Sequence, residues 1–166
     1  YWISTLYDLK ICLIEKEHDI ASHSSTRNSG VIHYPFYIDP KKKKNFARAA
    51  FLSHDMWKVL ANENNIPWVQ GGTIEIALDE EQHKTLEKYM VLGKENGLTE
   101  EDISILDSNE LKQKEPNLNC HSGLYCTKEG STNYGLLTKS ISELSKKNGT
   151  NFLLKRNAKY IEETSK

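Results

Sequence analysis

The first fourteen residues of this chain contain no glycine, although the 166-residue sequence has nine. A dinucleotide-binding turn of the form Gly-x-Gly-x-x-Gly, about 20 residues before an acidic strand end, is therefore missing from the start of the chain. No apolar run approaches the roughly 18 residues of a membrane-spanning helix, and no signal peptide is visible. The net charge of −1 predicts no general attraction to nucleic acid or to an anionic membrane surface. The basic run Lys41–Lys44 has no interleaved aromatic residue, which favours a solvated helix start over a phosphate contact.

Cysteine is also scarce, with three residues in the chain. Cys12 lies in an apolar run and is expected to be a small core residue. Cys120 and Cys126 are spaced too loosely for a zinc site, so we expect no bound metal. The odd count and the loose spacing favour a reducing, intracellular setting, and we expect a cytoplasmic location.

The pattern that is present lies between residues 11 and 33. A short apolar strand, Ile11–Ile14, ends on Glu15, and the polar loop His23–His33 follows, with its hydroxyls, an Arg, an Asn and Gly30. A carboxylate at the C-terminal end of a strand can bind both hydroxyls of a ribose, and Ser, Thr and backbone N–H groups can hold phosphate oxygens. This order is typical of a nucleotide site, although Glu15 alone could be an exposed acid. Because the glycine turn is missing, we interpret the chain as a piece of a larger enzyme.

Hydrophobic periodicity predicts a mixed arrangement of helices and strands. A helix is expected over residues 42–64, with a buried face made of Phe46, Ala49, Ala50, Ser53, Met56, Trp57 and Leu60. A strand over residues 73–78 should bury Ile74, Ile76 and Leu78. Further helices are expected at 79–96, 107–115 and 133–148, and further strands at 10–14, 103–106, 123–126, 151–154 and 159–162. Strand–helix–strand order suggests a parallel layer, and the middle of the chain suggests a second sheet.

The residues from Leu13 to His33 resemble the FAD-dependent oxidoreductases of the D-amino-acid oxidase superfamily. The likeness is to the branch that holds L-2-hydroxyglutarate dehydrogenases and flavin-dependent glycerol-3-phosphate dehydrogenases. It rests on Glu15 at a strand end and on the run Asn28-Ser29-Gly30-Val31-Ile32-His33. Weaker matches are Ile66-Pro67 before Gly71-Gly72-Thr73-Ile74, Glu115-Pro116 and Asn133-Tyr134-Gly135.

The resemblance implies an FAD site and a role for each matching residue. Glu15 would bind the adenosine ribose, and the backbone of Ala158 would contact the adenine. The hydroxyl residues Ser24, Ser25 and Thr26 would line the pyrophosphate and ribityl chain. The residues that would approach the flavin are Asn28, Ser29 and Gly30. Arg27 would either contact phosphate or flavin or pair with a surface carboxylate.

His33 is the candidate catalytic residue. The resemblance places it near the flavin and the substrate, where it could act as an acid or base, since histidine titrates in the useful pH range. A hydrogen-bonded structural histidine is the alternative. Two departures from the hydroxyglutarate pattern concern its neighbourhood: Arg27 stands where that branch usually has His, and Tyr34-Pro35 stand where it usually has small residues. The substrate loop is therefore expected to differ.

The fold class expected from this resemblance is α/β, with α+β character overall. A partial Rossmann-like FAD-binding domain (residues 1–40 and 134–166) would carry an inserted mixed-sheet substrate domain (residues 41–133). The implied activity is hydride transfer from a small 2-hydroxy acid, glycerol 3-phosphate or a related anion to flavin, with an electron acceptor that the sequence does not identify. The alternative is a non-catalytic truncated chain or binding module that needs a partner segment to fold. We expect the chain alone to be inactive.

Overall fold

The computed structural model describes residues 1–163 of the 166-residue chain. Contacts between Cα atoms divide it into two compact units. The first unit comprises Tyr1–Gly30 and Asn133–Lys166, and the second comprises Val31–Thr132. Residues 31–40, which the sequence assigned to the first domain, are thus grouped with the second unit. None of the helices in the described part of the chain has the length and apolar character needed to cross a bilayer.

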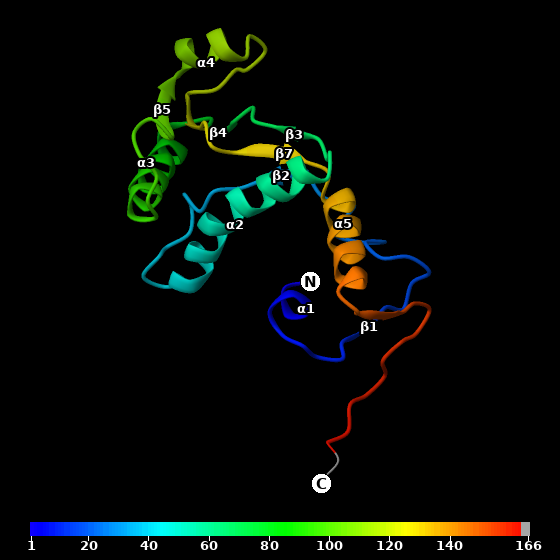
Figure 1. Ribbon diagram of the computed structural model, residues 1–166. Coiled ribbons are helices and arrows are strands. Elements are labelled where there is room, and N and C mark those ends of the chain that lie inside the picture. The colour runs from blue at the N-terminus through cyan, green and yellow to red at the C-terminus, as the bar shows by residue number, and fades with distance from the viewer. Residues whose placement is uncertain (164–166) are drawn as a thin grey trace. The chain divides into compact units, whose positions relative to one another are not determined.

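The first unit is built on a pair of parallel strands. β1 (Cys12–Ile14) pairs with β8 (Asn151–Leu153), in a register that sets Cys12 opposite Asn151 and Ile14 opposite Leu153. The unit also contains α1 (Trp2–Leu6) and α5 (Tyr134–Lys147), which leads into β8 (Figure 1). The parallel pairing confirms the parallel layer expected from the sequence.

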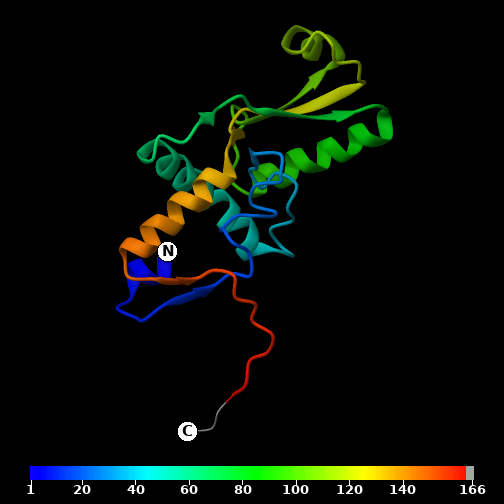
Figure 2. The ribbon, with the colours of Figure 1, turned by 90° about the vertical axis from the view of Figure 1, so that its right-hand side faces the viewer.

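Two expectations for the first unit are wrong. Cys12 is exposed, because all three residues of β1 lie at the surface of this small sheet. Residues 159–162 do not form a strand. The chain leaves the sheet at Lys155, whose φ of 56° interrupts the extended conformation, and it then runs on without regular structure (Figure 2).

The second unit contains two three-stranded antiparallel sheets. One has the order β4-β6-β5, from β4 (Thr73–Ala77), β6 (Ser122–Cys126) and β5 (Ile103–Asp107). The other has the order β2-β7-β3, from β2 (Val31–Ile32), β7 (Gly130–Thr132) and β3 (Trp68–Val69). The helices of this unit are α2 (Lys44–Glu63), α3 (Glu80–Glu95) and α4 (Ser108–Lys114). Figure 2 shows α3 and α4 on opposite sides of the β4-β6-β5 sheet.

Local sequence signals place the helix ends of this unit as expected. The carboxylate of Asp79 accepts from the Gln82 N–H at the start of α3, and Gly97, with a φ of 96°, follows its end. At the start of α4, Asp107 and Glu110 form the reciprocal hydrogen bonds of a capping box. The capping residues therefore begin α3 and α4 at the positions that the sequence predicts.

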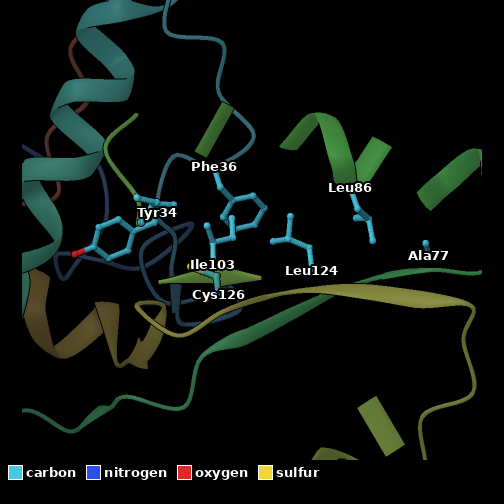
Figure 3. Close-up of a cluster of buried hydrophobic side chains, with 8 residues drawn as sticks. Tyr34, Phe36, Ala77, Leu86, Ile103, Leu124 and Cys126 are labelled. Atoms are coloured by element: carbon cyan, nitrogen blue, oxygen red, sulfur yellow. The ribbon is translucent and has the colours of Figure 1, made fainter. Parts of the chain in front are cut away.

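The hydrophobic core of the second unit lies between α3 and the β4-β6-β5 sheet. Figure 3 shows Leu124 and Ile103 projecting from the strands toward Phe36 and Leu86. The remaining buried members of the cluster are Tyr34, Ala77, Leu98 and Cys126. The segment after β2 therefore joins the core through Tyr34 and Phe36.

The face of β4 that enters this core is the one opposite to the sequence prediction. Ala77 is completely buried, whereas Ile76 is 43% exposed and Leu78 is 61% exposed. In the antiparallel register Glu75 pairs with Leu124 and Ile76 pairs with Gly123. The core face of β6 carries Leu124, so the residues of β4 on the same face are Thr73, Glu75 and Ala77.

The buried stripe of α2 also differs from the predicted one. The helix buries Ala47, His54 and Ala61, while Phe46 and Met56 are largely exposed. The stripe is displaced because the ring of His54 packs against the rings of two buried or half-buried aromatic residues. Its centroid lies 4.3 Å from that of Tyr34 and 5.3 Å from that of Trp68.

Candidate functional site

Glu15 lies directly after β1, at the C-terminal edge of the parallel pair. Its backbone N–H donates to the carbonyl oxygen of Leu153 at 3.0 Å, and its own carbonyl accepts from the Arg156 N–H at 2.9 Å. The side chain is half-buried, and Oε1 accepts from the Glu17 N–H at 2.9 Å. The carboxylate is thus held at the sheet edge, where ligands bind in open α/β sheets.

The same hydrogen bonds bring the C-terminal segment alongside Glu15. Ala158 follows Arg156 by two residues and is exposed, with its backbone in irregular structure. The two residues that the resemblance assigns to the adenosine end, Glu15 and Ala158, therefore belong to neighbouring segments of one unit. Their roles stay predictions.

The polar loop after Glu15 is a turn stabilised by its own side chains. The N–H groups of Thr26 and Arg27 donate to the carbonyl oxygen of His23 at 3.0 and 3.1 Å. The Thr26 hydroxyl donates to the carbonyl oxygens of Ala21 and His23. Asn28 donates through Nδ2 to the Ser24 carbonyl at 2.9 Å. Thr26 and Asn28 therefore shape the loop as well as offering groups to a ligand.

Gly30 ends this loop in a left-handed conformation, with a φ of 76°. Its N–H donates to Oδ1 of Asn28 at 2.9 Å. A residue with a Cβ would be strained there, so glycine is required by the backbone itself. The glycine need not reflect contact with a flavin ring, although it leaves the position free of a side chain.

Helix α5 holds the loop through a close approach at its N-terminus. A Cβ at Gly135 would lie 2.6 Å from Cγ2 of Thr26. Farther along the same helix, Lys139 Nζ donates to Oδ2 of Asp19 at 2.8 Å. This hydrogen bond lowers the pKa of Asp19. The run Asn133-Tyr134-Gly135 thus packs against the candidate nucleotide loop.

The donor set of this region fits a dinucleotide. In the described part of the chain, the hydroxyls of Ser24 and Ser25 have no protein hydrogen-bond partner, and the exposed Arg27 offers a guanidinium fork suited to phosphate. Glu15 supplies the carboxylate for a ribose. A ribose acceptor, hydroxyl donors and a cation within one unit are the groups that an FAD nucleotide requires.

His33 lies just after β2 and contacts a buried carboxylate that sequence reasoning missed. Its Nδ1 atom is 3.2 Å from both carboxylate oxygens of Glu129, and the imidazole is 47% exposed. Glu129 precedes β7 and has no exposed surface. The contact exists because β2 pairs with β7 in antiparallel register, with Ile32 opposite Gly130.

The carboxylate of Glu129 accepts from three donors, two on the adjacent residues His33 and Tyr34 and one on Thr73. The Tyr34 N–H donates to Oε1 at 2.7 Å, and the Thr73 hydroxyl makes a short hydrogen bond to Oε2. The hydrogen bond to Glu129 is the main reason that the pKa of His33 is raised, and the charge of Glu75 adds to the effect. Tyr34 and Pro35, which depart from the hydroxyglutarate pattern, are both buried in the second unit. The N–H of Tyr34 also helps to hold the carboxylate of Glu129.

The candidate residues fall into two groups. Glu15, Ser24–Gly30 and Ala158 belong to the first unit, whereas His33 belongs to the second. Little in the sequence could have identified Glu129, since it is one of 23 acidic residues and lies 96 positions from His33.

Comparison with known proteins extends over nearly all of the chain. The family model described as FAD dependent oxidoreductase matches residues 3–166. The mitochondrial L-2-hydroxyglutarate dehydrogenase of Caenorhabditis briggsae is 30% identical over 142 residues, which cover 86% of this chain and 32% of that protein. The glycerol 3-phosphate dehydrogenase of Caloramator mitchellensis is 29% identical over 158 residues, covering 94% of this chain and 32% of that one. The chain therefore spans about a third of the length of the curated relatives it matches.

A solved structure shows the same fold. It is the dithionite-reduced, FAD-bound L-α-glycerophosphate oxidase of Mycoplasma pneumoniae, with a TM-score of 0.79 and 26% identity. The match covers 93% of this chain and 40% of that chain.

Proposed function

Because the chain belongs to the family of FAD-dependent oxidoreductases, we propose that it contributes the ribose, phosphate and flavin contacts of an FAD site and the reactive histidine. The first unit would be part of the FAD-binding domain, and the second would belong to the substrate domain. The observation that carries the proposal is the half-buried carboxylate of Glu15 at the sheet edge, followed by the hydroxyl-rich loop. Family membership does not favour the alternative of a non-catalytic binding module.

We propose a small anionic alcohol as the substrate, of the 2-hydroxy acid or glycerol 3-phosphate type. The names of two relatives support this class, since one is an L-2-hydroxyglutarate dehydrogenase and the other a glycerol 3-phosphate dehydrogenase. The chemistry of His33 supports it too. Oxidation of an alcohol needs a group that removes the hydroxyl proton, and a half-exposed imidazole backed by a carboxylate can do this.

In such a reaction the residues of this chain would bind the FAD nucleotide and accept the proton of the substrate hydroxyl. Bound FAD supplies an acceptor for the hydride of the substrate carbon. Glu15 holds the ribose, the hydroxyls of Ser24 and Ser25 donate to the pyrophosphate, and the Arg27 guanidinium neutralises part of its charge. His33 accepts the hydroxyl proton at Nε2. Each of these roles requires only groups that the described chain presents.

The test is flavin content and substrate reduction in the complete natural protein. We expect flavin absorbance bands in the purified protein, and anaerobic bleaching by L-2-hydroxyglutarate or glycerol 3-phosphate. Glycine would serve as the amine comparison and should leave the bands unchanged. A colourless protein that takes up no added FAD would contradict the proposal.

Replacement of Glu15 tests the ribose contact separately. Glu15→Ala should weaken FAD binding by about 1–3 kcal/mol, because the half-buried acceptor for the ribose hydroxyls is lost. The matched control is Glu143→Ala, which removes an exposed carboxylate on α5 that pairs with Lys146. FAD titration by fluorescence measures both variants, and equal affinities would rule out the ribose role.

A further inference from the structure

The carboxylate of Glu129 is fully buried and accepts hydrogen bonds from three donors. These donors are the Tyr34 N–H, the Thr73 hydroxyl and the imidazole of His33. Burying an ionised carboxylate costs several kcal/mol unless such donors compensate it. Two of the donors are fixed groups of the fold, whereas the third belongs to a half-exposed side chain.

The geometry at His33 orients the imidazole ring. Nδ1 is equidistant from both oxygens of Glu129, at 3.2 Å, while about half of the ring remains exposed. A carboxylate accepts but cannot donate, so the nitrogen that faces it carries a proton. The other nitrogen, Nε2, is then unprotonated in the neutral ring and can accept a proton.

We propose that Glu129 is a positioning residue for the reaction: it fixes His33 in the tautomer with the proton on Nδ1, so that Nε2 is the base for the substrate hydroxyl. This inference rests on the proposed function and deepens it. Glu129 does not touch the substrate. It acts through His33, as a buried carboxylate behind a catalytic histidine does in other enzymes.

The step balances in atoms and electrons. The substrate carbon loses a hydride and the hydroxyl oxygen loses a proton, so a C=O bond forms in place of C–H and O–H. The electron pair goes with the hydride to the flavin, which is reduced, and the proton goes to Nε2 of His33. The imidazolium that results lies against the negative charge of Glu129, which stabilises it.

The titration of His33 follows from the groups that face it. Glu129 contacts Nδ1, the charge of Glu75 on β4 acts from farther away, and the ring of Tyr37 lies edge-on with a centroid 6.0 Å distant. Both carboxylates raise the pKa of His33. His33 therefore acts as a base only above its own raised pKa. Removal of the negative charge of Glu129 should lower that pKa and so move the acidic limb of the pH–rate profile to lower pH.

The experiment uses the complete natural protein loaded with FAD and compares Glu129→Gln, Glu129→Asp and Glu75→Gln. Glu129→Gln should lower kcat about 10²-fold and move the acidic limb of kcat/KM to lower pH, with little change in KM. Glu129→Asp keeps the charge and should restore most of the pH profile. Glu75→Gln is the matched control, because it removes an exposed carboxylate from the same neighbourhood and should shift the limb only slightly.

A second readout does not depend on activity. Imidazole NMR signals, assigned to His33 by a His33→Gln variant, give its titration directly. In the wild-type protein His33 should titrate above the ordinary value of 6.5, and in Glu129→Gln it should titrate lower. This measurement decides the matter even if Glu129→Gln fails to fold, since a wild-type His33 that titrates at or below 6.5 would overturn the proposal.

The outcomes separate this inference from the proposed function. If the protein binds no FAD, the proposed function fails, while the titration still tests the pairing of His33 with Glu129. If FAD binds and alcohols reduce it, but Glu129→Gln leaves the His33 titration and the acidic limb unchanged, the positioning role is wrong and the function stands.

Discussion

The two units of this chain differ sharply in how much core each one possesses. Among the described residues, every buried hydrophobic side chain except Leu137 lies in Val31–Thr132. In the first unit, large apolar side chains of α1 and β1 are exposed, Leu6 by 68% and Ile14 by 52%. The second unit therefore carries its own packed core, while the first unit has large apolar side chains at its surface.

The two units also differ in how their candidate sites are held in place. The pair of His33 and Glu129 rests on antiparallel strands and a packed core, so its geometry is preorganised without a ligand. The candidate nucleotide loop is a turn held by Thr26, Asn28 and the approach of α5. We infer that FAD itself contributes to the order of the first unit, because a ligand that binds only the folded state stabilises it.

The largest effect is expected from a substitution in the core of the second unit, compared with a similar substitution in the first unit. Leu124→Ala should lower the free energy of unfolding by about 2–5 kcal/mol, since this side chain is completely buried. Leu13→Ala in β1 should cost less than about 1 kcal/mol, because Leu13 is already 38% exposed. Urea unfolding followed by fluorescence measures both. Equal losses would contradict the contrast between the two units.

The next effect concerns the approach of α5 to the candidate nucleotide loop. Gly135→Ala should cost about 1–3 kcal/mol, because the new Cβ would lie 2.6 Å from Cγ2 of Thr26. Thr26→Ser removes that methyl group and keeps the hydroxyl, so the double variant should recover most of the loss. A double-mutant cycle of unfolding free energies tests the contact. Losses that simply add would mean that the loop and the helix do not touch.

The smallest effect is a pH dependence confined to the second unit. Burial lowers the pKa of His54, which packs between Tyr34 and Trp68 and contacts Asp55. The neutral ring is favoured in the folded state, so its contribution to stability is present above pH 6.5 and is lost as the pH falls through the lowered pKa. His54→Phe removes this titration and should flatten the acid loss. Parallel pH curves of unfolding free energy for both proteins would contradict it.

Much of the secondary structure could be predicted because its signals are local. Asp79 and Asp107 begin helices, Gly97 ends one, and each signal acts within a few residues. The face of β4 could not be predicted in this way, because its buried residue is the small Ala77 and the more apolar face carries Ile76. Which face is buried depends on where α3 packs.

The candidate site, too, could be predicted from the sequence only where its residues lie close together along the chain. Glu15 and the loop up to Gly30 lie close together in the sequence, so their order alone indicated a nucleotide site. Glu129 reaches His33 only through the pairing of β2 with β7, across 96 positions. The role proposed for Glu129 depends on a tertiary contact that no local sequence pattern indicates.

Hydrogen–deuterium exchange of the complete natural protein, with and without FAD, tests the division between the two units most directly. We predict that FAD slows exchange in residues 15–30 and in the segment around Ala158, while the amides of β4, β5 and β6 remain equally protected in both states. Exchange that FAD leaves unchanged in residues 15–30, or slows only in the β4-β6-β5 sheet, would contradict the assignment of the nucleotide site to the first unit.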